Sequence, residues 1–258
     1  MRMHGGRAVG VVLALLGGVA AVAIGIPGPE TSNEDPFISC ASRVIVIDTS
    51  SSDRSPVLSN LAKRVITAAA KSAVVCNDSL SVYGVAGGGA ESTIVTTDDL
   101  TRFTPIGPTA QIRSLRFKSA QRSALNSLIS ARLRAAYDTS DPNVTSVPAL
   151  YWAASEYLTR GVQILLITDG VNDDAHLNLN KPLAVGAGAM LAQSVTVSSL
   201  RGATVTIVGL AQVDANAAPP SAVWPSQIRN FNAVLCHASG ATLCRLFALA
   251  SITQSLDS

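Results

Sequence analysis

Aromatic residues and net charge are both scarce in this sequence. Phe, Trp and Tyr make up 4% of its 258 residues, and 19 Lys and Arg against 17 Asp and Glu leave a formal net charge of +2. A surface dedicated to nucleic acid needs an excess of basic residues, and a platform for single-stranded bases needs aromatic side chains. The composition therefore argues against nucleic acid, and against a polyacidic partner, as the main ligand.

Several motifs that define enzyme classes are also missing. The sequence contains no GxSxG nucleophile elbow and no HExxH zinc motif. Its glycine-rich stretch at 84–92, GVAGGGAES, lacks the GxxxxGKS/T spacing of a phosphate-binding loop and precedes strand-like residues. We interpret that stretch as a turn, and we expect the protein not to be an enzyme.

The amino terminus carries an export signal. Arg2 and Arg7 precede an uncharged apolar run at 8–26, which a Pro-Gly-Pro segment ends. The run is just long enough to span a membrane and also contains Ala21-Val22-Ala23, a possible signal-peptidase site. Residues 1–29 are therefore either a signal anchor or a cleaved signal peptide. We expect a single-pass protein of the cell membrane, touching lipid through this segment only, with its domain outside the cytoplasm; a cleaved signal would make it secreted.

Four cysteines in an exported chain favour disulfides over metal ligands, because none of them has CxxC spacing. Cys40 lies just before the first predicted strand, and Cys76 follows the first predicted helix. Cys236 ends a late helical pattern, and Cys244 falls in or beside the next strand. Strand starts and helix ends meet at one edge of an α/β sheet. This topology favours Cys40 with Cys76 and Cys236 with Cys244, although sequence alone leaves other connectivities open.

One stretch, RVIVIDTSSSDRSPVLS, organises the rest of the chain. Its β-branched run at 44–47 has the composition of a buried strand and ends at Asp48. Asp48, Ser50 and Ser52 form the pattern DxSxS, and a Ser-Pro pair then predicts the start of a helix. Open α/β sheets bind ligands beyond the carboxyl ends of their strands. A carboxylate and two hydroxyls there suit Mg²⁺ or Mn²⁺ better than zinc, but helix capping by the same polar loop is an alternative explanation.

A second apolar strand also ends in an aspartate. The run at 161–167 leads into Thr168-Asp169-Gly170, and we expect the two aspartates that follow, Asp173 and Asp174, to be solvated. If the two strands are neighbours, Asp48 and Asp169 meet at one crevice. Two carboxylates in one crevice require a cation or a shared proton.

The remaining patterns alternate between strands and helices, which predicts an α/β protein. We expect a doubly wound, mostly parallel central sheet of about six strands, one of them a short antiparallel edge strand, flanked by helices. The domain at 42–247 follows a linker at 30–41 and precedes a tail at 248–258. The predicted strands are 44–47, 79–85, 93–96, 161–167, 203–208 and 241–247, and the predicted helices are one from 56 onward, 120–136, 149–158, 184–200 and 226–237.

A long connection at 98–144 separates the third predicted strand from the next core helix. Within it, 102–137 is rich in Arg and Lys and has no acidic residue, and 120–136 has the spacing of an amphipathic helix. This basic helix could meet anionic lipid or an acidic partner. A helix that packs on the core and keeps its basic face in solvent explains the same pattern.

Three pieces of the sequence, in this order, resemble the von Willebrand factor type A (VWA) domain. They are DTSSS at 48–52, Thr145 before a central helix, and ITDG at 167–170. In that family these pieces form a metal-ion-dependent adhesion site on a Rossmann-like fold. The resemblance implies that Ser50, Ser52 and Thr145 bind Mg²⁺ (or Mn²⁺) through their hydroxyls. It also implies that Asp48 and Asp169 bind directly or through water, and that an acidic group of a partner completes the octahedron.

These observations lead to one main functional expectation and two alternatives. We expect an extracytoplasmic binding module, because Mg²⁺ with an open position and no adjacent basic side chain recognises a carboxylate of a protein partner rather than activating water. A metal-free structural scaffold is the first alternative. The second is a Mg²⁺-dependent phosphatase with Asp48 as nucleophile, but Ser50 stands where such enzymes need a second aspartate.

Overall fold

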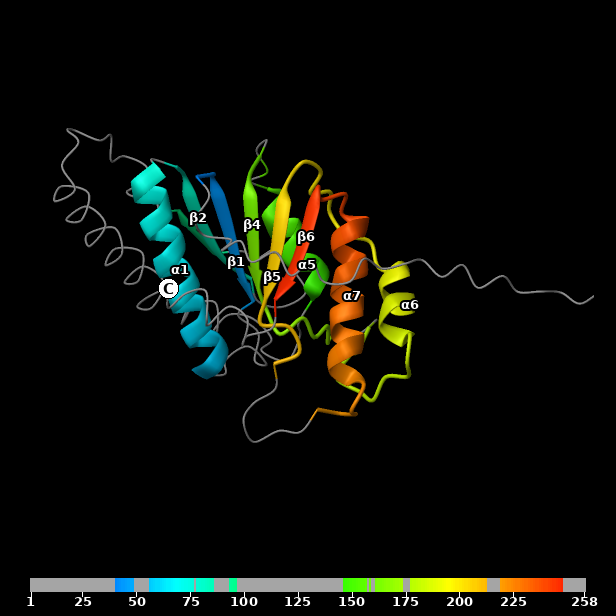
Figure 1. Ribbon diagram of the computed structural model, residues 1–258. Coiled ribbons are helices and arrows are strands. Elements are labelled where there is room, and N and C mark those ends of the chain that lie inside the picture. Colours follow the sequence, from blue (N-terminus) through cyan, green and yellow to red (C-terminus); the bar gives the residue numbers. More distant parts are fainter. Residues whose placement is uncertain are drawn as a thin grey trace, which may run out of the picture. The chain divides into compact units, whose positions relative to one another are not determined.

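The computed structural model describes residues 40–48, 56–76, 78–85, 93–96, 146–156, 158, 161–173, 177–212 and 219–247. All of them belong to one compact unit, Thr31–Ser258. A six-stranded sheet in the order β3-β2-β1-β4-β5-β6 forms the centre of this unit (Figure 1). The strands are β1 (Arg43–Asp48), β2 (Leu80–Val85), β3 (Thr93–Thr96), β4 (Gln163–Ile167), β5 (Thr204–Val208) and β6 (Leu243–Phe247).

Neighbouring strands of the sheet are parallel except β2 and β3, which are antiparallel. This arrangement confirms the predicted fold class: a doubly wound, mostly parallel, Rossmann-like sheet with one short antiparallel edge strand. The strand order reverses at β1, because β2 and β3 lie on one side of it and β4, β5 and β6 on the other. Open α/β sheets bind ligands at such a reversal, beyond the carboxyl ends of the strands, which here are β1 and β4.

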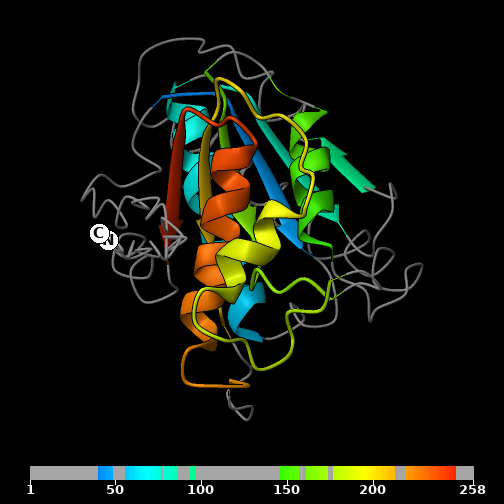
Figure 2. The ribbon, with the colours of Figure 1, turned by 90° about the vertical axis from the view of Figure 1, so that its right-hand side faces the viewer.

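Helices cover both faces of the sheet. On one face α1 (Pro56–Cys76) packs over β1 and β2, and on the other α5 (Val147–Ser155) packs over the same two strands. α7 (Trp224–Ala238) lies on the α5 face and contacts β6. α6 (Ala187–Gln193) packs against α7 on the side away from the sheet, as Figures 1 and 2 show.

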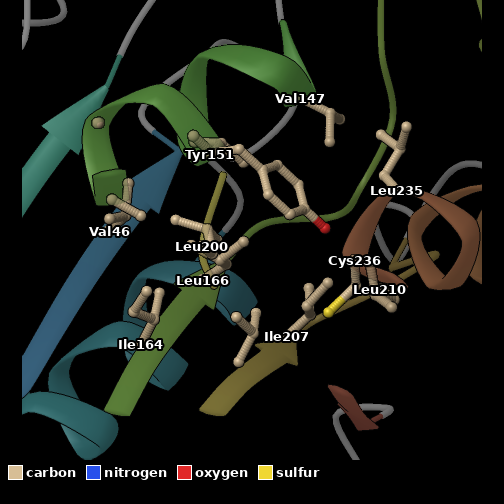
Figure 3. Close-up of a cluster of buried hydrophobic side chains, with 14 of the residues drawn as sticks. Val46, Val147, Tyr151, Ile164, Leu166, Leu200, Ile207, Leu210, Leu235 and Cys236 are labelled. Carbon is tan, nitrogen blue, oxygen red and sulfur yellow. The ribbon is translucent and has the colours of Figure 1, made fainter. Parts of the chain in front are cut away.

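Alternate residues of the central strands enter two separate apolar cores, because successive side chains of a strand point to opposite faces. All six residues of β1 are buried. Val44 and Val46 pack in the core beneath α5 and α7, whereas Ile45 and Ile47 pack beneath α1. Figure 3 shows side chains of β1, β4 and β5 around Tyr151 of α5. Each such burial contributes about 1.5–3 kcal/mol, which explains the uninterrupted β-branched composition of β1.

The structure corrects the predicted helix at 184–200, which forms only between Ala187 and Gln193. At its start, Gly186 has a φ of +83°, a left-handed conformation that separates the helix from the chain before it. At its end, the sequence Val-Thr-Val-Ser-Ser has low helix propensity. The N–H of buried Leu200 then donates to the carbonyl of Ser239 at 2.8 Å. A tertiary hydrogen bond therefore takes the place of a helical one.

Two disulfides lie at the amino-terminal edge of the sheet. Cys40 is bonded to Cys76, with the Cα atoms 5.3 Å apart, and Cys236 is bonded to Cys244, with the Cα atoms 6.1 Å apart. Both favoured pairings are confirmed. Chain-entropy arguments assign about 4 kcal/mol to the first bridge and about 2.5 kcal/mol to the second, because the first closes the longer loop.

Several predictions concern residues outside the described ranges. They are the signal segment with its apolar run at 8–26, the basic helix at 120–136 and the tail at 248–258. These stay predictions. In the part of the chain that the structure describes, none of the helices has both the length and the apolar character needed to cross a membrane.

Candidate metal-binding site

The candidate site lies where the strand order reverses, at the carboxyl edge of the sheet. Asp48 is the last residue of β1, and Asp169 follows the end of β4 by two residues. β1 and β4 are parallel neighbours with Ile47 opposite Ile167, so both aspartates leave the sheet at the same edge. This edge is the lower one in Figure 1. The condition under which the two aspartates share an edge, that their strands are neighbours, is therefore met.

Both carboxylates are buried. Asp48 is 4% exposed and Asp169 is 3% exposed. An ionised carboxylate is costly to remove from water unless hydrogen bonds or a cation compensate it. Each of these two carboxylates therefore needs hydrogen bonds or a cation in the folded protein.

Thr168 connects the two strand ends. Its hydroxyl donates to Oδ2 of Asp48 at 3.0 Å across 120 positions of sequence, and it accepts a hydrogen bond from the N–H of Gly170 at 2.9 Å. The hydroxyl proton is directed toward Asp48, so the oxygen is left to accept from the backbone. Thr168 thereby orients the Asp48 carboxylate and ties it to the turn that carries Asp169.

Asp169 is held by its own turn and by the adjacent strand. Its Oδ1 accepts a hydrogen bond from the N–H of Val171 at 2.8 Å, a short-range contact typical of Asx turns. Its backbone carbonyl accepts from the N–H of Ala211, just beyond β5, at 2.7 Å. Hydrogen bonds thus hold both the side chain and the main chain of Asp169 at the carboxyl edge of the sheet.

Gly170 permits a close approach of this turn to α7. Its φ is +74°, and a Cβ there would lie 2.4 Å from Cδ2 of Leu210 and 2.5 Å from Nδ2 of Asn232. The same Asn232 nitrogen donates to the carbonyl of Gly170 at 3.0 Å and to that of Ile228 at 2.9 Å. No residue with a side chain fits here without displacing the neighbours, which accounts for the glycine of the TDG segment.

Asn172 joins the β4 turn to the start of α5. Its Oδ1 accepts a hydrogen bond from the N–H of Val147, the first residue of α5, at 2.9 Å, and its Nδ2 donates to the carbonyl of Leu177 at 2.7 Å. The side chain is 1% exposed. Thr145, the predicted third hydroxyl ligand, precedes Val147 by two residues in the sequence. Asn172 therefore fixes the helix start that follows this candidate ligand.

The structure places two of the five predicted ligands and leaves three outside the described residues. Asp48 and Asp169 lie at the same edge, linked through Thr168. Ser50, Ser52 and Thr145 fall outside the described ranges. Asp173, which we expected to be solvated, is half-buried and accepts a hydrogen bond from Nδ2 of Asn178, and Asp174 falls outside the described ranges.

Sequence reasoning missed the residues that support the two aspartates. Thr168, Asn172 and Asn232 act through partners 120, 25 and 62 positions away, so no local pattern marks them. Only the position of Thr168 beside Asp169 in the TDG segment offered a signal. A hydroxyl at the carboxyl end of a buried strand is a plausible partner for the carboxylate of the neighbouring strand.

Comparison with known proteins adds little beyond the fold. No protein-family model matches the sequence, and no curated protein matches it significantly. One similar solved structure is an aerotolerance-related membrane protein from Bacteroides fragilis. It is 14% identical, with 84% of this chain and 98% of that chain covered, and the TM-score is 0.35. Another is the conserved hypothetical protein BatB from Bacteroides thetaiotaomicron, 14% identical with 84% and 97% covered and a TM-score of 0.33.

Proposed function

We propose that this protein is a VWA-type binding module that holds Mg²⁺ or Mn²⁺ at the carboxyl edge of its sheet and binds a carboxylate of a protein partner through that ion. One observation carries the proposal. Two buried aspartates, Asp48 and Asp169, end adjacent strands at the point where the strand order reverses, and Thr168 hydrogen-bonds one to the turn of the other. Ligand sites of open α/β sheets lie at such points.

The available donors suit a hard divalent cation. Asp48 and Asp169 contribute carboxylate oxygens, and by the VWA resemblance Ser50, Ser52 and Thr145 contribute hydroxyl oxygens. A set of oxygen ligands with few charges fits Mg²⁺, which retains open or water-filled positions in its octahedron. The bound ion would offset the cost of burying two carboxylates and would present one position to an acidic group of the partner.

Binding fits these residues better than catalysis. A phosphatase that uses an aspartate nucleophile needs a second carboxylate two residues later as acid or base, and Ser50 occupies that position. We therefore propose a protein that is not an enzyme and whose partner is another protein. The amino-terminal apolar run supports a location outside the cytoplasm, with the domain tethered to the membrane or secreted.

Calorimetric titration of Mg²⁺ and Mn²⁺ into the protein tests this proposal directly. We expect saturable binding that disappears in the double variant Asp48→Ala/Asp169→Ala. Asp173→Ala is the matched control. It removes a carboxylate from the same loop after β4, but this carboxylate accepts a hydrogen bond from Asn178 and is not one of the proposed metal ligands. Equal affinity of the wild type and the double variant would refute the site. Loss of binding in Asp173→Ala alone would show that the ion sits elsewhere in the loop.

A metal-free scaffold is a second candidate, and one observation favours it. Each carboxylate already accepts a hydrogen bond from the protein, from Thr168 in one case and from the N–H of Val171 in the other. A scaffold predicts a thermal unfolding temperature that is the same in excess EDTA and in excess Mg²⁺. The adhesion-type site predicts a higher temperature in Mg²⁺, because a ligand that binds only the folded state stabilises it.

A further inference from the structure

A second group of potential metal ligands lies at the opposite edge of the sheet. Cys40 stands three residues before β1, Cys76 is the last residue of α1, and Asp78 lies between α1 and β2. One ligand atom from each of these three residues lies within 4.8 Å of the other two. Among the described residues this is the one cluster of three or more Cys, His, Asp or Glu side chains that could share an ion.

The carboxylate of Asp78 supplies a second observation, independent of the distances within the cluster. Its Oδ2 is inaccessible to solvent and has no hydrogen-bond partner among the described residues, while its backbone N–H donates to the carbonyl of Ala73 at 3.0 Å. A buried carboxylate oxygen without a partner is costly. The backbone bond holds Asp78 beside the end of α1, so its carboxylate stays close to the two sulfurs. A cation between them would satisfy this oxygen.

We propose that Cys40, Cys76 and Asp78 form a zinc site when the Cys40–Cys76 disulfide is reduced. Two thiolates and one carboxylate are a ligand set typical of Zn²⁺, with water as the fourth ligand of a tetrahedron. Sulfur atoms about 3.8 Å apart meet that geometry, since Zn–S bonds are about 2.3 Å long. The Cα atoms of the two cysteines are 5.3 Å apart, so the sulfurs reach this separation by side-chain rotation.

Reduction of the Cys40–Cys76 disulfide precedes zinc binding. A dithiol reductant transfers two electrons and two protons to the disulfide; the S–S bond breaks, two thiols form and the reductant becomes a disulfide. Zn²⁺ then displaces the two thiol protons. Re-oxidation removes both thiolate ligands, so the disulfide and the zinc ion exclude each other. Cys40 is exposed, which gives the reductant access to the bridge.

Charge near the site is compatible with this assignment. Two thiolates and a carboxylate leave one net negative charge after Zn²⁺ binds. Arg43, 1% exposed at the start of β1, donates from Nη1 to Oγ of Ser72 in the last turns of α1, at 3.0 Å. This guanidinium places a positive charge at the same end of α1 and offsets the excess.

The second disulfide offers a matched control within the same chain. Cys236 and Cys244 also bridge a helix end to a strand, but no acidic or histidine ligand atom of the described residues joins them in a cluster. Two thiolates alone are an incomplete site. Reduced Cys236 and Cys244 should therefore bind Zn²⁺ far more weakly than the proposed site.

Titration of Co²⁺ into the reduced full chain tests the proposal. The protein is first reduced with dithiothreitol, and the dithiothreitol is then removed under anaerobic conditions. Excess Mg²⁺ occupies any oxygen-donor site during the titration. We expect one Co²⁺ per chain, seen by thiolate charge-transfer and tetrahedral d–d absorption and displaced by Zn²⁺, and no such bands in the oxidised protein. Cys40→Ser/Cys76→Ser should abolish binding, and Cys236→Ser/Cys244→Ser should retain it. Asp78→Asn should weaken it about tenfold or more, since even outer-shell changes cost about 10–100-fold.

Circular dichroism recorded beside each titration separates loss of the site from loss of the fold. Reduced protein with a native spectrum and no saturable Co²⁺ binding would overturn the proposal. So would an Asp78→Asn variant that binds as tightly as the wild type. If reduction unfolds the chain, added Zn²⁺ should restore the native spectrum, and failure to do so would overturn the proposal as well. None of these outcomes bears on the Mg²⁺ site, which Asp48 and Asp169 define.

Discussion

Replacing Thr168 by Val tests whether the two strand ends of the candidate site are coupled. Valine preserves the shape of threonine but removes the donor to Oδ2 of Asp48 and the acceptor for the N–H of Gly170. Thr168 is 1% exposed, so water cannot replace either bond without rearrangement. A hydrogen bond to a charged group contributes about 1.5–3 kcal/mol, and an unsatisfied buried N–H costs about 1–3 kcal/mol. We expect a loss of about 3 kcal/mol in the free energy of unfolding.

Thr168→Ser is the control for this prediction. Serine keeps the hydroxyl and loses one buried methyl group, which costs about 1 kcal/mol. Urea denaturation followed by circular dichroism measures both variants, and equal slopes in urea validate the comparison. Mg²⁺ affinity should fall about tenfold in the valine variant and stay near the wild type in the serine variant, because Thr168 positions the Asp48 carboxylate. Stabilities of the two variants within about 0.5 kcal/mol of each other would refute the coupling.

Three further predictions concern the same core and site. Gly170→Ala should lower the free energy of unfolding by about 3 kcal/mol, because the added Cβ would clash with Asn232 and alanine would be strained at this positive φ. Urea denaturation measures this loss, and a value below about 1 kcal/mol would show that the turn relaxes freely. Asn172→Ala should lower the free energy of unfolding by about 1–2 kcal/mol, because it leaves the N–H of Val147 unpaired, and it should weaken Mg²⁺ binding; unchanged Mg²⁺ affinity would show that the start of α5 does not depend on this bond. Tyr151→Phe should not destabilise the protein, because the buried Oη of Tyr151 has no hydrogen-bond partner in the part of the chain that the structure describes. Burial also raises the pKa of Tyr151 above its ordinary value of 10.0. The wild type should therefore lose stability as pH rises beyond about 10, because there the tyrosine ionises only in the unfolded state. The Tyr151→Phe variant should lack the part of this pH dependence that Tyr151 causes.

The surroundings of Tyr151 are apolar among the described residues. Figure 3 shows its ring between α5 and α7, with the oxygen on the side of Cys236. The ring is 0% exposed and packs in the core beneath these helices. Its apolar burial outweighs the unpaired hydroxyl, since an aromatic side chain buries a large area.

The sequence determined the fold class and the positions of most elements. The apolar run at 44–47 and the largely apolar stretch at 161–167 are typical of buried parallel strands, and both strands formed where these stretches predicted them. The two disulfide pairings also followed from the order of elements, because strand starts and helix ends share an edge. The helix at 184–200 was predicted too long, since the bond from Leu200 to Ser239 depends on a contact that local propensity does not contain.

For the site, sequence alone indicated that Asp48 and Asp169 each follow the end of an apolar strand. That these two strands are neighbours was decided by the tertiary structure. Only the tertiary structure decided how this edge of the sheet is held. The hydroxyl of Thr168 donates to Asp48, the side-chain amide of Asn172 bonds to the start of α5, and that of Asn232 donates to the carbonyl of Gly170. It also decided that Asp78 meets the sulfurs of the first disulfide. The physical reason is the same in each case. A short polar side chain finds its partner through the packing of distant elements, and its own sequence neighbourhood does not encode that distance.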